Sequence, residues 1–179
     1  MQPELPDDRP RGLYFLVDLV NTLQGDPEAT AAGLQAVVDL HGGPPRRLAG
    51  ASVPELREAV ALLVAVLDLD DVNRAADAVN ALLDRYPSRP RLVRLEGRPW
   101  AVHGQTPQDA GPVHWLLSTA ALALALWLGE RGRCAWGRCA APGCDRYFVD
   151  AGRRSPQRFC SPRCGTRVRV TAHRRQYGR

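Results

Sequence analysis

The spacing of apolar residues along the chain predicts helices before any other property is considered. Between residues 13 and 23, leucine, valine and phenylalanine recur at the period of one helix face, and Gly25 follows as a natural stop. A second run of this kind, from Leu34 to Leu40, meets two glycines and then two prolines, which do not continue a helix. The first part of the chain therefore predicts two helices.

The next two helices begin with recognisable caps. Ser52 and Glu55 have the spacing of a capping box, and leucines and valines follow them at helical periodicity. Asp70 or Asp71 can cap a fourth helix, because aspartate side chains accept hydrogen bonds from the first free backbone amides. We expect this helix to run to about Tyr86, where prolines end it.

A β-hairpin and a long helix are predicted next. Residues 92–95 and 100–103 are short strand-like runs on either side of a Glu-Gly-Arg-Pro turn. Thr106 is the expected cap of a buried helix that reaches Arg131, with an early kink at Pro112. Its apolar run of 14 residues is shorter than the roughly 20 that a membrane span needs. We therefore expect no membrane insertion.

Charge divides the chain into two unequal parts. Residues 1–130 hold 11 arginines against 17 acidic residues, a net charge of −6, whereas residues 131–179 hold 13 arginines against two, a net charge of +11. We expect a tail over residues 1–10, a mainly α domain with one hairpin over residues 11–132, and a small basic module over residues 133–179.

Composition and the first residues indicate the compartment. Apolar residues make up 45% of the chain and charged residues 24%, as in globular proteins. The first ten residues lack the basic start and apolar run of a secretory signal. We therefore expect a cytoplasmic protein, in which thiols stay reduced and clustered cysteines are more often metal ligands than disulfides.

Four of the five cysteines have the spacing of a zinc site. Cys139 and Cys144 are separated by four residues, Cys160 and Cys164 by three, and fifteen residues lie between the pairs. Two short pairs and one long loop predict a tetrahedral site for one structural Zn²⁺, with no open position for catalysis. A redox dithiol switch and buried free thiols are the alternatives, and Cys134 is left over.

The residues around these cysteines predict a treble-clef-like finger. A Pro-Gly turn forms a knuckle between the first two cysteines, residues 146–149 and 157–160 read as two strands, and Ser161 with Pro162 opens a terminal helix. Such a segment is too small to fold on its own apolar area. We expect zinc binding to drive its folding.

The predicted terminal helix is rich in arginine. Arginine makes phosphate contacts and recognises guanine, and a helix fits the DNA major groove. We therefore expect double-stranded DNA as the partner; a solvated helix face is the alternative, and RNA or an acidic protein are alternative partners. The candidate contact residues are Arg163, Arg167, Arg169, His173, Arg174 and Arg175.

The module resembles the CGNR zinc-finger family. The resemblance is carried by the motif Cys-Ala-Ala-Pro-Gly-Cys from Cys139 and by Cys-Ser-Pro-Arg-Cys-Gly-Thr-Arg from Cys160. Upstream, Val-Asp-Leu-Val-Asn-Thr over residues 17–22 is similar to the opening of the ABATE domain, which usually precedes this finger.

The resemblance implies a bacterial, stress-related transcription regulator. The finger would bind DNA, and the helical domain would sense a ligand or assemble. Arg158 and Thr166 join the candidate DNA contacts on this ground. Thr166 stands where the family has asparagine, so the amide that can read a base is absent, whereas a hydroxyl is retained.

Three polar residues of the first helix are candidates for a different site. Asp18, Asn21 and Thr22 lie within one helical turn and can line a pocket for a small-molecule effector; hydrogen bonding within the helix is the alternative. No paired carboxylates, nucleophile-base set or phosphate loop stands out, so we expect no enzyme. Because one finger covers few base pairs, a homodimer is expected to assist DNA recognition.

Overall fold

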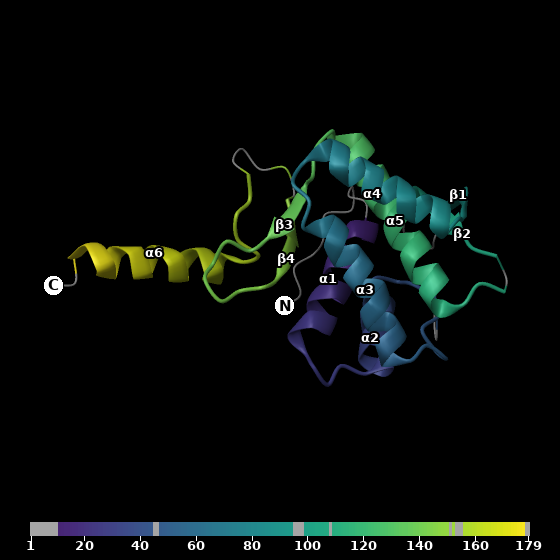
Figure 1. Cartoon of the computed structure of the whole chain (residues 1–179), viewed down its shortest axis with the longest axis horizontal. Coiled ribbons are helices and arrows are strands. Elements are labelled where there is room, and N and C mark those ends of the chain that lie inside the picture. The colour runs from purple at the N-terminus through teal and green to yellow at the C-terminus, as the bar shows by residue number, and fades with distance from the viewer. Residues whose placement is uncertain are drawn as a thin grey trace.

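A computed structural model gives the structure of residues 11–44, 47–94, 99–107, 109–150, 152 and 156–177. Within these residues the chain forms six helices and two antiparallel two-stranded sheets (Figure 1). In chain order the elements are α1 (Arg11–Gly25), α2 (Ala31–Leu40), α3 (Val53–Leu67), α4 (Val72–Arg85), β1 (Arg89–Arg94), β2 (Trp100–Gln105), α5 (Pro112–Arg131), β3 (Trp136–Arg138), β4 (Tyr147–Val149) and α6 (Pro162–Tyr177). A mainly α fold is confirmed.

Helix α5 is the central helix of the body. It packs against α1, α3 and α4, and its inward side chains Leu116, Leu124 and Trp127 have no exposed surface. By length and composition alone α5 would suffice to cross a membrane. Here its apolar residues form the core between the other helices, so the prediction of a long buried helix is confirmed.

Local capping signals set the starts of two helices as predicted. Ser52 Oγ accepts a hydrogen bond from the backbone N–H of Glu55 at 3.3 Å, and the Glu55 carboxylate accepts the N–H of Ser52 at 2.8 Å. This is a complete capping box for α3. At α4 the Asp71 carboxylate accepts the N–H of Arg74 at 2.9 Å.

The predicted start of α5 is wrong. The helix begins at Pro112, with Gly111 as its N-cap, and it is not capped by Thr106. A proline inside a helix lacks the N–H for the ladder and clashes with the carbonyl four residues earlier, whereas the first turn tolerates it. The hydroxyl of Thr106 instead accepts a hydrogen bond from Arg47 Nη2 at 3.0 Å.

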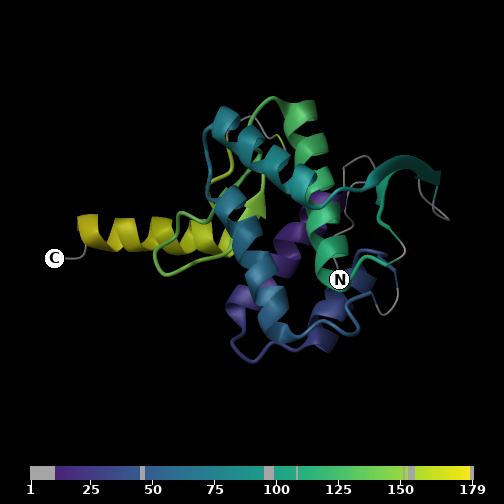
Figure 2. The ribbon, with the colours of Figure 1, turned by 45° about the vertical axis from the view of Figure 1, so that its right-hand side comes forward.

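The β1–β2 hairpin lies next to α5 and projects beyond it (Figure 2). Its register pairs Arg89 with Gln105 and Arg94 with Trp100. The predicted pairing is therefore confirmed, although β1 begins three residues earlier and β2 ends two residues later than the apolar runs indicate. The predicted turn at residues 95–98 lies outside the described residues.

The small β3–β4 sheet shares the core of the helical body. Trp136 and Tyr147 are nearly buried and belong to the same apolar cluster as the inward residues of α1 and α5. The core thus crosses the predicted domain boundary at residue 132, whereas α6 extends away from the body (Figure 1). The predicted tail, residues 1–10, lies outside the described residues.

Candidate metal centre

Four cysteine thiols meet at one point of the structure. The Sγ atoms of Cys139, Cys144, Cys160 and Cys164 all lie within 4.8 Å of one another. Those of Cys144, Cys160 and Cys164 form a triangle with sides of 3.7, 3.7 and 3.8 Å. A tetrahedral zinc ion with Zn–S bonds of about 2.3 Å places its sulfurs about 3.8 Å apart. The four thiols therefore fit one structural Zn²⁺ with no open coordination position.

A tight turn brings the first two cysteines together. Gly143 has a φ of +70°, which favours glycine, and the N–H of Cys144 donates to the carbonyl of Ala141 at 3.0 Å. The Cys139 sulfur accepts a hydrogen bond from the N–H of Cys160 at 3.4 Å. The knuckle therefore forms as predicted, and it joins β3 to β4.

The start of α6 positions the second pair. Ser161 Oγ accepts the N–H of Cys164 at 3.3 Å, and the N–H of Gly165 donates to the carbonyl of Ser161 at 3.3 Å. Cys164 thus lies in the first turn, where the positive end of the helix dipole favours a thiolate. A Cβ at Gly165 would lie 3.2 Å from Phe159 Cδ2, so the helix start and this ring are in close approach.

The protonation of the thiols agrees with a metal site. Burial raises the pKa of Cys139, but hydrogen bonds from the backbone N–H groups of Cys160 and Ala141, together with those from the thiols of Cys144 and Cys160, outweigh it and lower that pKa to about 7. Burial, and then the neighbouring sulfurs, raise the pKa of Cys160 to about 12. Four adjacent thiols cannot all ionise without a compensating cation, and a bound dication supplies that charge.

The predicted strand pairing inside the finger is wrong. β4 pairs with β3, which the sequence analysis did not identify, and residues 156–159 form no strand. The carbonyl of Arg158 accepts a hydrogen bond from the backbone N–H of Ala140 at 2.9 Å. Phe148 instead covers Gly137 on β3, where a Cβ would lie 3.3 Å from its Cζ. The β3 sequence Trp-Gly-Arg has one residue of a type that is enriched in strands, whereas all three residues of the equally short β4 are of such types.

The remaining cysteine is separate from the cluster. Cys134 is partly buried, and burial raises its pKa, with a smaller contribution from the carboxylates of Asp70 and Asp71. Within the described residues it is not among the four grouped ligands. The structure therefore gives Cys134 no place in the zinc site.

The candidate nucleic-acid contacts gather on α6 and just before it. Seven of these candidates have described side chains, and all seven are exposed: Arg158, Arg163, Thr166, Arg167, Arg169, His173 and Arg174. The side chain of Arg175 lies outside the described part of the chain. Arg167 Nη2 donates to the carbonyl of Pro142 at 3.1 Å, which ties α6 to the knuckle, and Arg169 Nη2 donates to Thr166 Oγ1 at 3.2 Å. A surface hollow is lined by Arg163, Cys164, Thr166 and Arg167.

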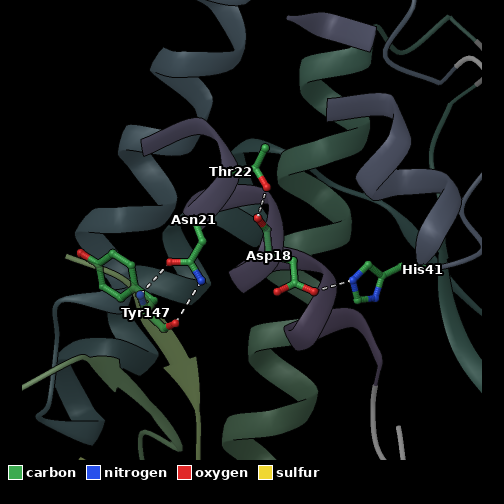
Figure 3. Close-up of polar contacts among 5 residues, drawn as sticks. All are labelled: Asp18, Asn21, Thr22, His41 and Tyr147. Atoms are coloured by element: carbon green, nitrogen blue, oxygen red, sulfur yellow. Dashed lines mark hydrogen bonds and ion pairs between the residues drawn. The ribbon is translucent and has the colours of Figure 1, made fainter. Parts of the chain in front are cut away.

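The three polar residues of α1 point in different directions (Figure 3). The amide of Asn21, which is nearly buried, is bonded to the backbone of Tyr147, and the hydroxyl of Thr22 donates to the carbonyl of Asp18 at 2.8 Å. The Asp18 carboxylate lies 2.9 Å from His41 Nε2. These contacts occupy the polar atoms of Asn21 and Thr22 within the protein. A small-molecule pocket at this place stays a prediction.

The partners in this network, Tyr147 and Asp68, were not predicted from the sequence. Tyr147 O–H donates to the Asp68 carboxylate at 2.6 Å, and burial, followed by this hydrogen bond, raises the pKa of Tyr147. One signal was present in the sequence: Asn21 lies four residues after Val17, on the apolar side of the helix. A polar side chain in a buried stripe indicates a buried hydrogen-bond partner.

Comparison with known families agrees with this geometry. Residues 136–176 match the CGNR zinc finger, a range that contains all four cysteines. Residues 15–131, more than half of the chain, match the ABATE family, whose description is "Putative stress-induced transcription regulator". Among curated proteins, none matches the chain significantly. The chain therefore belongs to the ABATE family and carries a CGNR zinc finger over residues 136–176.

Proposed function

We propose that this protein is a transcription regulator that binds double-stranded DNA through the zinc-held helix α6. The observation that carries the proposal is the placement of α6, which leaves the body at the zinc site and extends into solvent with its arginines exposed (Figure 1). In the described part of the chain, α6 contacts the zinc knuckle near its N-terminal end, through its first turn and the side chain of Arg167. Most of the surface of the helix is therefore available to a partner.

The arginines of α6 form a coherent contact surface. Arg163, Arg167 and Arg174 recur at intervals of four and seven residues, so they share one side of the helix, and Thr166 and His173 lie beside them. A helix is about 10–12 Å wide with its side chains, which matches a major groove about 12 Å wide. Guanidinium groups on this side are suited to phosphates and to guanine edges.

The charge distribution supports the same orientation. The part of the chain before residue 131 carries −6 and the part from residue 131 onward carries +11. DNA attracts the second part and repels the first, so the molecule approaches with α6 leading. In this proposal the helical domain assembles the regulator or senses an effector, and the protein is a cytoplasmic binding protein with no catalytic activity.

An acidic protein surface is the second candidate partner. Val170 lies on the arginine side of α6 and is 43% exposed, and an apolar residue amid arginines also fits a protein interface. RNA is a further alternative for the same basic surface. These alternatives are distinguished by whether duplex DNA competes for the helix.

The test is selection from a random duplex-DNA library by the zinc-loaded full chain, followed by affinity measurements on the enriched sequence. We expect Arg174→Ala to weaken binding about tenfold, because one arginine contact to DNA contributes roughly 1–3 kcal/mol. Arg74→Ala, on the exposed side of α4, is the matched control and should leave binding unchanged. If no sequence is enriched and Arg174→Ala binds duplex DNA as the wild type does, the proposal is wrong.

A further inference from the structure

The outer part of the β1–β2 hairpin presents an apolar surface to solvent. The register pairs Leu92 with Val102 and Arg94 with Trp100, and residues paired across antiparallel strands point to the same face. We call these four residues the hairpin face. Its apolar members Leu92, Trp100 and Val102 are 68%, 65% and 37% exposed. Leu92 and Trp100 are therefore largely uncovered, and Val102 is partly covered.

In the described part of the hairpin, its base is the part that rests on the body. A Cβ at Gly104 would lie 3.4 Å from Leu122 Cδ2 of α5, so β2 approaches α5 closely there. Because alternate residues of a strand share a face, Val102 and Trp100 continue outward on the side that touches α5 at Gly104. A two-stranded hairpin with nothing behind its outer part is marginally stable in water. This arrangement favours a partner that covers the hairpin face.

Charge identifies the kind of partner. Residues 89–105 contain four arginines and one acidic residue, a net charge of +3. Arg94 lies on the hairpin face, and Arg89 and Arg91 lie on the opposite face of β1. Residues 1–88 and 106–130 together contain seven arginines and sixteen acidic residues, a net charge of −9. Exposed carboxylates of that body include Asp77 and Asp84 on α4. A basic hairpin on an acidic body is complementary to the body of another copy of the same chain.

We propose that the hairpin face docks on the acidic helical body of a second copy, so that the protein forms a homodimer. Tryptophan and arginine side chains with apolar neighbours dominate protein–protein interfaces. In a two-fold dimer each copy contributes one hairpin and one body, so the complementary contact is made twice. The proposal does not depend on DNA binding, since the hairpin and α6 lie at opposite ends of the molecule (Figures 1 and 2).

Two other modes of contact are disfavoured by the same residues. Edge-to-edge pairing of two β1 strands would align Arg89, Arg91 and Arg94 with like charges, and Pro90 lacks an N–H for the new ladder. A nucleic acid is a poor match for the hairpin face, because three of its four side chains are aliphatic or aromatic with only Arg94 charged. Docking on a protein surface remains.

The test is sedimentation equilibrium of the zinc-loaded full chain without DNA, at low salt and over a wide range of protein concentration. We expect a dimer whose dissociation constant rises at least about thirtyfold in Leu92→Ser/Trp100→Ser, because aromatic hot spots cost about 2 kcal/mol or more when truncated. Arg94→Glu should weaken the dimer with the hairpin residues otherwise intact. Leu40→Ser, at an equally exposed leucine of α2 (62%), should leave it unchanged.

Trp100 provides a second readout in the unmodified chain. The other three tryptophans are no more than 9% exposed, so acrylamide quenching reports Trp100, and it should decrease as the dimer forms. A wild-type chain that stays monomeric, or a dimer that withstands both hairpin variants, would overturn the proposal. So would hairpin variants that weaken DNA binding while the oligomeric state stays unchanged, because the hairpin would then be a nucleic-acid contact.

Discussion

The side chain of Asn21 is hydrogen-bonded to both backbone groups of Tyr147, a residue 126 positions further along the chain. Its amide nitrogen donates to the carbonyl at 3.0 Å, and its amide oxygen accepts the N–H at 2.8 Å (Figure 3). Both contacts are buried. The Asn21 side chain thus makes the two hydrogen bonds that a neighbouring strand would make at the free edge of β4. It links helix α1 to the sheet that carries the zinc knuckle.

Replacement of Asn21 by alanine should destabilise the whole chain. The change leaves a buried N–H and a buried C=O of Tyr147 without partners, and each such group costs roughly 1–3 kcal/mol. We expect the free energy of unfolding of the zinc-loaded protein in urea to fall by about 2–4 kcal/mol. Asn80→Ala on the exposed side of α4 is the control and should change it little. An equal effect of both substitutions would contradict the assigned role of Asn21.

The contrast between Asn21 and the helix caps shows what the sequence could predict. The capping box of Ser52 and Glu55 acts within four residues, so its pattern is visible in the sequence and its helix was placed correctly. The partner of Asn21 is distant, and a single sequence carries no signal of such a pairing. The same reason explains why β4 was assigned a wrong partner strand, since pairing depends on tertiary packing.

Two glycines in helices should respond in opposite ways to alanine. A Cβ at Gly12 in α1 would lie 2.7 Å from Ala123 Cβ, so α1 and α5 approach each other too closely there for a side chain. We expect Gly12→Ala to lower the free energy of unfolding by about 1–3 kcal/mol, as overpacked cores do. At Gly129 in α5 a Cβ would meet nothing within 4 Å.

Gly129→Ala should therefore raise the free energy of unfolding, by about 0.5–1 kcal/mol, because alanine is the better helix former. Urea denaturation of both variants beside the wild type measures the pair. If both substitutions stabilise the protein, the close approach of α1 to α5 does not exist in solution. If both destabilise it, helix propensity is not the deciding factor at Gly129.

Removal of zinc should unfold one part of the chain and leave the other intact. α6 and the knuckle depend on the four thiolates, whereas Trp136 and Tyr147 are held in the apolar core of the body. After chelation we expect fast amide exchange over residues 156–177 and continued protection of α5. Cys144→Ser should reproduce this pattern, and Cys134→Ser should retain one zinc per chain. Loss of protection in α5 would show that the metal supports the whole fold.

Zinc affinity should fall with pH because the ligands must be thiolates. Metal binding lowers the pKa of each ligand far below its value in the unfolded chain, so the stability from zinc is present at high pH and is lost as the pH falls. Without metal the pKa of Cys139 is about 7, so below that pH even this ligand must release a proton. Chelator competition across this range should show a steepening loss of affinity toward acid, and a flat profile would exclude thiolate ligation.

The zinc ligands were easier to predict than their surroundings for a physical reason. Cys139 and Cys144, like Cys160 and Cys164, lie close together in sequence, because a short turn or one helical turn must place both sulfurs on one ion. The arginines of α6 were also identifiable by density and helical spacing. Their orientation away from the body was not, since it depends on which elements pack and which do not (Figure 1).

DNA binding by α6 should depend strongly on salt, and the dependence should count the phosphate contacts. Each phosphate neutralised on duplex DNA contributes about −0.9 to the slope of log K against log salt. If Arg163 contacts a phosphate, Arg163→Ala lowers the slope by about 0.9 with the same loss for every sequence. Replacement of an arginine that reads a base would instead relax the sequence preference.

Arg74→Ala on α4 is the control and should leave the slope unchanged, because that residue belongs to the acidic body. A slope near zero for the wild-type protein would mean that the exposed arginines of α6 do not contact phosphates, and it would favour an acidic protein as the partner of this helix.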